Sequence, residues 1–257
     1  MQNLTGKIAV ITGASSGIGE ATAYELAKAC VNLILVGRRQ KRIEILAQEI
    51  EKDFKVKVLP VIIDVRDKNK VAEFVNNLSD VWKDIDILVN NAGLALTTDL
   101  FPNANTDNWD TMIDTNIKGL LYMTHAVLPN MIARNTGHII NISSIAGLEC
   151  YLGGNVYSST KHTVRAISKS LRLDLNNYNI RVSDIAPGAV NTEFSTVRWN
   201  DKERADAFYS DFNPLLAEDI ADAILYCVTR KPHVNVESLV VMPTDQASAT
   251  TINRGKL

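Results

Sequence analysis

The amino-acid sequence predicts a doubly wound α/β fold, in which one parallel sheet of about seven strands has helices on both faces. Two observations predict this fold class. Short apolar runs rich in β-branched residues alternate with longer stretches of helical periodicity, as is typical of parallel sheets covered by helices. A glycine-rich turn also follows the first apolar run directly, at the point where the first strand of such a sheet enters its first helix.

The predicted elements follow one another in an order that lets every strand join the same sheet. Seven apolar runs have the length and the residue types of buried strands: 7–12, 32–37, 56–62, 85–90, 137–142, 180–186 and 237–242. Six segments have helical periodicity: 17–29, 40–53, 68–82, 109–134, 155–177 and 217–229. Because each helix between two strands can serve as a right-handed crossover, residues 1–257 are expected to form a single domain.

One stretch fits no element of this sheet. Residues 188–213, GAVNTEFSTVRWNDKERADAFYSDFN, are polar, contain several aromatic residues and follow the sixth predicted strand. Long insertions beyond the end of a strand commonly form lids or substrate loops. We therefore expect residues 188–213 to be a substrate loop.

Composition and charge argue against several classes of partner. The chain has 46% hydrophobic and 22% charged residues and a net charge of -2, so neither a nucleic acid nor an anionic membrane is an expected partner. Its three cysteines, Cys30, Cys150 and Cys227, are widely spaced and form no metal-binding pair. This pattern predicts a reducing compartment and no bound metal.

The two ends of the chain bear on its localisation. The first residues, MQNLTGK, lead straight into the first predicted strand, and no apolar run approaches the length of a membrane span. A cytoplasmic protein is therefore expected. The last residues, GKL, differ in their first position from the peroxisomal signal Ser-Lys-Leu, so peroxisomal import is not expected.

The turn after the first strand has the sequence TGASSGIG, with glycines at Gly13, Gly17 and Gly19. Glycine lets the chain turn sharply and lets the backbone approach a pyrophosphate, while the start of the next helix offers free N–H groups. At this position in a doubly wound sheet, the turn predicts a dinucleotide site in a Rossmann-like fold.

The end of the second strand indicates which dinucleotide is bound. Sites for NAD place an acidic residue there, about 20 positions after the glycines, whereas this chain has Arg38 and Arg39. Two guanidinium groups suit a phosphate, so NADP is the expected cofactor. In the alternative interpretation these arginines, with Lys41 and Arg42, form a solvated first helical turn. Asp64, which ends the third strand, is expected to meet the adenine or to cap a helix.

A tyrosine and a lysine lie four positions apart in the segment NVYSSTKHTVRAI, at Tyr157 and Lys161. On a helix their side chains share one face. About 0.4 such pairs are expected by chance in this chain, so the pair alone is not specific. Beside a dinucleotide it has a chemical meaning, because a nearby cation lowers the pKa of a phenol from about 10 by roughly 1–3 units.

Taken together, the motifs resemble the short-chain dehydrogenase/reductase family over nearly the whole chain. The resemblance rests on TGASSGIG, NNAG, DTNIKG, the tyrosine and lysine pair and PGAVNTEF, which occur in this order on the expected elements. It implies a catalytic set of Asn116, Ser144, Tyr157 and Lys161. Tyr157 would then act as general base or acid, and Ser144 would donate a hydrogen bond to the carbonyl oxygen.

The motifs and the family resemblance also give the expected contacts of cofactor and substrate. The expected cofactor contacts are Gly13, Ser15, Ser16, Gly17, Ile18, Gly19, Arg38, Arg39, Asp64, Val65, Asn91, Ala92, Gly93, Tyr157, Lys161, Pro187, Gly188, Val190 and Thr192. The expected substrate contacts are Ser144, Tyr157 and Arg198. The Arg198 guanidinium is expected to bind a substrate carboxylate or, alternatively, to be solvated or paired with Asp201 or Glu203.

The C-terminal half narrows the resemblance. Its segments NTEFSTVRW, KPHVN and LVVMPTDQAS resemble NADP-dependent 3-hydroxy acid dehydrogenases, which implies substrates such as serine, allo-threonine or 3-hydroxyisobutyrate, or the corresponding 3-oxo acids and semialdehydes. Two alternatives stay open, a reductase of broader carbonyl or 3-oxoacyl substrates and a protein that senses NADP without turnover. The family further implies a homotetramer, with apolar stripes on predicted helices 109–134 and 155–177 available to pair across a two-fold axis.

Overall fold

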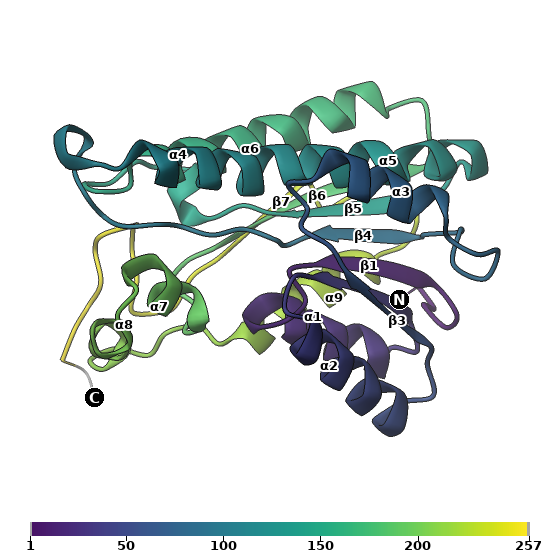
Figure 1. Ribbon diagram of the computed structural model, residues 1–257, viewed down its shortest axis with the longest axis horizontal. Coiled ribbons are helices and arrows are strands. Elements are labelled where there is room, and N and C mark those ends of the chain that lie inside the picture. The colour runs from purple at the N-terminus through teal and green to yellow at the C-terminus, as the bar shows by residue number, and fades with distance from the viewer. Residues whose placement is uncertain (1, 256–257) are drawn as a thin grey trace.

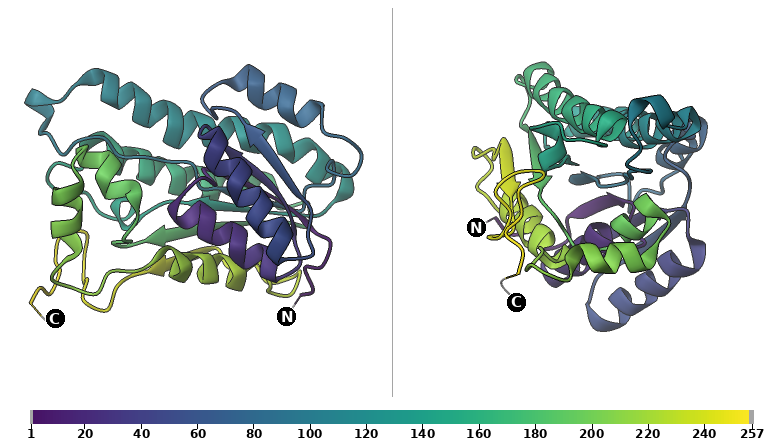
Figure 2. Two further views of the ribbon diagram at one scale, coloured as in Figure 1. Left: turned by 60° about the horizontal axis from the view of Figure 1, so that its bottom comes forward. Right: turned by 90° about the vertical axis from the view of Figure 1, so that its left-hand side faces the viewer.

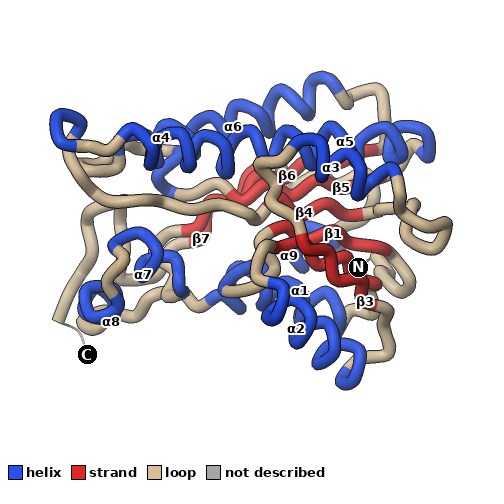
Figure 3. The backbone as a smooth tube through the Cα atoms, viewed as in Figure 1, coloured by secondary structure: helices blue, strands red, loops and turns tan. Residues whose placement is uncertain are grey.

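A parallel sheet of seven strands forms the centre of the molecule (Figure 1 and Figure 3). This computed structural model describes residues 2–255. The strands are β1 Ile8–Thr12, β2 Asn32–Gly37, β3 Val58–Ile62, β4 Ile87–Asn90, β5 Gly137–Ile142, β6 Ile180–Pro187 and β7 Ser238–Val241. Their order is β3-β2-β1-β4-β5-β6-β7, so the chain returns to the centre of the sheet between β1 and β4, where such folds bind ligands. The predicted fold class is confirmed.

Two layers of helices enclose the sheet (Figure 2), with α1, α2 and α9 on one face and α3, α4, α5 and α6 on the other. Their bounds are α1 Gly17–Lys28, α2 Gln40–Asp53, α3 Lys68–Asn76, α4 Thr106–Ile113, α5 Leu120–Arg134, α6 Asn155–Asp174 and α9 Ala217–Val228. The short helices α7 Glu193–Trp199 and α8 Lys202–Tyr209 belong to neither layer. They follow the carboxyl end of β6 and form most of the predicted loop 188–213.

The burial of the central strands explains why their sequences are apolar throughout. Ala9 and Ile11 of β1 pack into the core on the side of α1, α2 and α9. Ile8 and Val10 of the same strand pack into the core on the side of α3 and α5. Because successive side chains of a strand point to opposite faces, a sheet covered on both faces needs apolar residues at every position.

The predicted helix 109–134 is two helices joined by a wider turn. Helix α4 begins earlier, at Thr106, where the Asn105 side chain caps it by accepting a hydrogen bond from Asp107 N at 2.9 Å. The chain then continues through a π-helical turn, η2 Asp114–Gly119, into α5. Such turns are rare and often mark functional sites, and this one contains Asn116. Sequence periodicity does not distinguish a single wider turn from a regular helix.

Candidate active site

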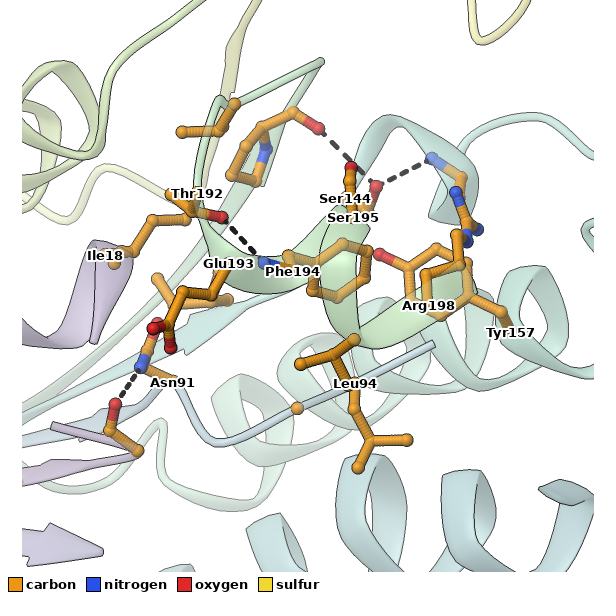
Figure 4. Close-up of a pocket in the computed structure, with 18 of the residues that line it drawn as sticks. Ile18, Asn91, Leu94, Ser144, Tyr157, Thr192, Glu193, Phe194, Ser195 and Arg198 are labelled. Atoms are coloured by element: carbon orange, nitrogen blue, oxygen red, sulfur yellow. Dashed lines mark hydrogen bonds between the residues drawn. The ribbon is translucent and has the colours of Figure 1, made fainter. Parts of the chain in front are cut away.

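A cavity of about 730 Å³ opens at the carboxyl ends of the central strands, beneath α7 (Figure 4). Most residues predicted to contact cofactor or substrate line it: Gly13, Ser15, Ser16, Gly17, Ile18, Arg38, Arg39, Asp64, Val65, Asn91, Ala92, Gly93, Ser144, Tyr157, Lys161, Pro187, Gly188, Val190, Thr192 and Arg198. Gly19, a predicted cofactor contact, and Asn116, a predicted catalytic residue, are not among the residues that line it. The cavity has the volume that a large ligand needs.

The glycine-rich turn leaves no room for side chains at its centre. Gly13 and Gly17 have positive φ values of +66° and +55°, which favour glycine. A Cβ atom at Gly19 would lie 2.4 Å from the carbonyl oxygen of Gly13. Ser16, the residue before α1, makes no side-chain cap, so the first N–H groups of the helix stay available. The turn thus fits the pyrophosphate of a dinucleotide, with α1 supplying the positive end of its dipole.

Basic residues flank this turn at the end of β2. Arg38 lies on the cavity wall, with Nη1 3.6 Å from Asp64 Oδ2. Arg39 Nε donates to Ser15 Oγ at 2.9 Å, which ties this guanidinium to the glycine-rich turn. Asp64 lines the cavity and accepts a hydrogen bond from Arg66 N at 3.0 Å in the turn that follows β3. Asp67, rather than Asp64, caps α3, so the helix-cap role considered for Asp64 is wrong. Two guanidinium groups and no carboxylate at the end of β2 suit a 2′-phosphate.

The four predicted catalytic residues come together between β5 and α6. Tyr157 and Lys161 lie on the first turns of α6, and Ser144 follows β5. Lys161 Nζ donates to the Ile142 carbonyl at 2.9 Å and lies 5.9 Å from the centre of the Tyr157 ring. All four side chains are nearly enclosed, with Asn116 2%, Lys161 5%, Tyr157 8% and Ser144 9% exposed.

Asn116 acts from behind the wall of the cavity. Its amide nitrogen donates to the Leu94 carbonyl at 2.8 Å and to Thr160 Oγ1 at 3.0 Å, and its oxygen accepts from Leu94 N at 2.8 Å. Thr160 directly precedes Lys161 on α6. The π-helical turn therefore joins the segment after β4 to the helix that carries the tyrosine and the lysine.

Electrostatics at Tyr157 differ from the sequence-based expectation. Burial raises the pKa of Tyr157 to about 12, and the Arg198 guanidinium and a hydrogen bond with Ser144 oppose this rise. Lys161 was expected to be the cation that favours the ionised phenol, but the cation that most lowers the pKa of Tyr157 is Arg198. Its Cζ lies 5.0 Å from the centre of the Tyr157 ring, against 5.9 Å for Lys161 Nζ.

Lys161 has its own buried environment. Burial lowers the pKa of Lys161 to about 8, and the Asp184 carboxylate raises it. Asp184 lies on β6, and its Oδ2 is 3.3 Å from Arg165 Nη1, one helical turn beyond Lys161 on α6. Asp184, on β6, therefore favours the charged form of Lys161.

Arg198 lies over the tyrosine rather than in solvent (Figure 4). Its Nη2 donates to the Tyr151 hydroxyl, and its carbonyl accepts from Thr97 N at 2.8 Å. The alternative partner Asp201 instead caps α8 by accepting from Arg204 N at 3.0 Å. Within residues 2–255, Arg198 forms no ion pair, and its buried Nε bonds no group.

Sequence reasoning missed several residues that line the cavity. Tyr151 and Phe194 surround the Arg198 guanidinium, with each ring centre 5.7 Å from its Cζ. Glu193 binds Arg39 across the cavity at 2.7 Å. Gln246 supports its rim by accepting from Ala189 N at 2.7 Å. Gln246 lies in the MPTDQ run, and Glu193 and Phe194 lie in the PGAVNTEF run, but these motifs do not show what the side chains contact, because the contacts depend on how the segment 188–213 folds.

Residues 2–255 contain neither a cluster of metal-binding side chains nor a helix suited to a membrane. No group of three or more His, Cys, Asp or Glu side chains there could hold a metal ion. No helix in this range combines the length and the apolar character that crossing a lipid bilayer requires. The last two residues of the GKL sequence, 256 and 257, lie outside the described part of the chain.

Comparison with known proteins decides the family. The sequence pattern of the short chain dehydrogenase family matches residues 7–203, which is more than half of the chain. The chain belongs to this family. It is 45% identical over 256 residues to an NADP-dependent 3-hydroxy acid dehydrogenase of Schizosaccharomyces pombe, covering 99% of each chain. It is also 45% identical over 250 residues to sulfoacetaldehyde reductase 2 of Chromohalobacter salexigens, covering 96% of this chain and 98% of the relative.

A solved structure resembles the chain over nearly its whole length. The closed form of a serine dehydrogenase complexed with NADP+ has a TM-score of 0.91 and 44% identity, covering 94% of this chain and 97% of that one. The predicted family is confirmed, and so is the prediction of an NADP-dependent oxidoreductase.

Proposed function

We propose that the protein transfers a hydride between NADP and a short 3-hydroxy acid of the serine, allo-threonine or 3-hydroxyisobutyrate type, or the corresponding 3-oxo acid or semialdehyde. The observation that carries the substrate class is the Arg198 guanidinium above the Tyr157 ring, with Nε bonded to no protein group. A carboxylate enclosed beside the reacting hydroxyl needs such a cation. The name of the 45% identical relative from Schizosaccharomyces pombe, an NADP-dependent 3-hydroxy acid dehydrogenase, supports the same class of substrate.

NADP supplies the hydride chemistry when bound, and the side chains of this chain supply binding and proton transfer. Tyr157 takes the hydroxyl proton during oxidation and returns it during reduction. Ser144 donates a hydrogen bond to the substrate oxygen as charge develops on it. Lys161 holds the nicotinamide ribose, and Asn116 keeps this part of α6 in place through Thr160. Arg38 and Arg39 bind the 2′-phosphate.

Arg198 has two roles in this proposal. It binds the substrate carboxylate, and its charge lowers the pKa of the buried Tyr157, which desolvation alone would raise further. The second role affects charged and uncharged substrates alike, since it acts on the tyrosine. The first affects only substrates that carry an anion. A comparison of matched substrates therefore separates the two.

The test is Arg198→Leu assayed with 3-hydroxyisobutyrate and with its uncharged methyl ester. We expect KM for the acid to rise about 10- to 100-fold, the scale of a lost charged hydrogen bond, and KM for the ester to change little. Arg198→Lys is the matched control, because it keeps the charge without the planar fork and should retain part of the affinity.

Other outcomes would change the assignment. Equal effects of Arg198→Leu on the KM values of acid and ester would mean that the residue supports folding of the loop. No effect on either would leave the carboxylate to other groups. Turnover of many uncharged carbonyl compounds at the rate of the acid would favour the broader reductase. No turnover of the acid or of any of these compounds would favour the NADP-sensing protein.

A sulfonate is a second substrate anion that suits this guanidinium. The 45% identical relative named sulfoacetaldehyde reductase 2 supports it, because a sulfonate also presents several oxygen acceptors to a forked donor. Assay of 2-hydroxyethanesulfonate beside 3-hydroxyisobutyrate ranks the two anions in the same active site.

A homotetramer remains part of the proposal. Among the apolar residues expected at the interface, Leu120, Val164 and Leu175 are buried within the chain, whereas Ile113, Ile117, Ile167 and Leu171 are half-buried. Leu121 is 40% exposed on α5 and remains available for a neighbouring copy. Sedimentation at micromolar concentration decides between the tetramer and a monomer.

A further inference from the structure

Helix α7 carries side chains of opposite charge at its two ends. Glu193, in its first turn, lies at the cofactor end of the cavity on the side of Ile18 and Asn91 (Figure 4). Arg198, in its last turn, lies over Tyr157. One short helix thus connects the cofactor end of the site to its substrate end.

The Glu193 carboxylate is held by two guanidinium groups of the α2 region. Its Oε2 accepts from Arg39 Nη1 at 2.7 Å, and its Oε1 accepts from Arg42 Nη1 at 2.7 Å. The hydrogen bond from Arg39, followed by that from Arg42, lowers the pKa of Glu193, so the carboxylate is charged at neutral pH. Each carboxylate oxygen faces a different arginine, as two oxygens of a phosphate would.

Arg39 connects this carboxylate to the phosphate-binding part of the site. Besides Glu193, it donates to Ser15 Oγ and Ser16 Oγ in the glycine-rich turn. A 2′-phosphate that binds Arg39 therefore arrives beside a carboxylate already bound there. Two anions that share one guanidinium repel each other at this distance, so they compete for it.

We propose that Glu193 is a specificity-determining residue that takes the place of the 2′-phosphate at Arg39 until NADP displaces it. This inference rests on the proposed placement of the 2′-phosphate at Arg38 and Arg39. Displacement releases the first turn of α7 from α2. NAD has a hydroxyl group instead of the phosphate, so it leaves the Glu193 ion pairs in place.

The ion pairs of Glu193 with Arg39 and Arg42 are exposed to solvent, so a phosphate can replace the carboxylate. The side chains of Arg39, Arg42 and Glu193 are 42%, 51% and 44% exposed, so solvent and salt screen their attraction. A phosphate monoester carries a charge of about −1.5 to −2 at pH 7 and is the stronger partner. Removing the Glu193 charge should therefore favour the phosphate.

The experiment is Glu193→Gln titrated calorimetrically with 2′,5′-ADP and with 5′-AMP, which differ only in the 2′-phosphate. We expect the Kd of 2′,5′-ADP to fall about five-fold and that of 5′-AMP to change by less than about two-fold, as for exposed ion pairs. Glu203→Gln is the matched control, because Glu203 is exposed on α8 and forms no salt bridge within residues 2–255. It should leave both Kd values unchanged.

Three results would overturn the proposal: an equal change for both ligands, no change for either, or weaker binding of 2′,5′-ADP. The Arg38→Gln, Arg39→Gln double variant shows which part has failed. If it weakens 2′,5′-ADP while Glu193→Gln has no effect, the phosphate site stands and the competition is wrong. If neither variant responds, the phosphate site itself is wrong.

Amide hydrogen exchange in residues 193–199 tests whether displacement of Glu193 releases the first turn of α7 from α2. In the wild type, 2′,5′-ADP is expected to speed exchange there and 5′-AMP to leave it unchanged, because only 2′,5′-ADP carries the phosphate that displaces Glu193. In Glu193→Gln, neither ligand should change it. Slower exchange in the wild type with 2′,5′-ADP would show that carboxylate and phosphate bind together, which contradicts displacement.

Discussion

The floor and the lid of the cavity are built in opposite ways. The floor consists of four side chains that are each at most 9% exposed: Asn116, Ser144, Tyr157 and Lys161. Hydrogen bonds to backbone carbonyl groups hold Asn116 and Lys161 in place. The lid helix α7 is instead held at one end by ion pairs whose side chains are 42–51% exposed. Buried hydrogen-bonded groups keep one geometry, whereas exposed ion pairs can exchange partners with a charged ligand.

This difference predicts which kinetic quantity each part controls. A fixed floor suits proton transfer, because general acid–base catalysis needs the donor within hydrogen-bond reach of the reacting oxygen. An exchangeable lid suits recognition, because it can respond to the charge of cofactor and substrate. Changes in the floor should therefore lower kcat, and changes in the lid should alter KM and Kd.

The largest effect is expected for Tyr157→Phe, which removes the proton donor and keeps the ring. We expect kcat to fall by at least ~100-fold, the scale of a lost acid–base group, while the Kd of NADP changes little. Steady-state kinetics and cofactor titration measure the two. Tyr151→Phe is the control, because Tyr151 bonds Arg198 and should affect KM more than kcat. A Tyr157→Phe enzyme with most of its turnover would refute the assignment.

A smaller effect is expected at the cofactor end from the Arg38→Gln, Arg39→Gln double variant. Loss of charge-assisted hydrogen bonds to one phosphate should weaken NADP by ~2–3 kcal/mol and leave NAD almost unchanged. Titration with both dinucleotides measures the difference. Equal losses would mean that the arginines support the structure, for which the Arg39 bonds to Ser15 and Ser16 offer a route.

The contrast between floor and lid also separates what the sequence predicted from what it did not. The strands, the glycine-rich turn and the tyrosine and lysine pair were predicted, because each depends on a short stretch of chain. The Glu193 contacts join residues more than 150 positions apart, at Arg39 and Arg42. No local pattern encodes such a contact, since it depends on the final fold of the lid.

The electrostatic error has the same origin. Lys161 was taken as the dominant cation because it lies four residues from Tyr157 on one helix. Arg198 lies 41 positions away in sequence, yet α7 brings it closer to the ring than the lysine. Spacing on a helix shows which side chains share a face, but not which distant segment covers that face.

The smallest effect is expected one layer below the floor, at Asp184. Its side chain is 5% exposed and pairs with Arg165, and its charge opposes the burial that lowers the pKa of Lys161 to about 8. Asp184→Asn removes this negative charge, so the charged lysine becomes less favourable and its pKa falls further. Lys161 then loses its proton at lower pH, and with it the charge that in the proposed function holds the ribose.

The alkaline limb of kcat/KM for oxidation should therefore move to lower pH in Asp184→Asn, by about half a unit to one unit, in profiles from about pH 6 to pH 10. Asp174→Asn, an exposed change at the end of the same helix α6, is the matched control and should leave the limb in place. Because Asp184→Asn leaves Arg165 without its partner, a melting temperature checks that the variant is folded. A folded variant with an unshifted alkaline limb would show that Asp184 does not act on the lysine, and the limb would then belong to another group.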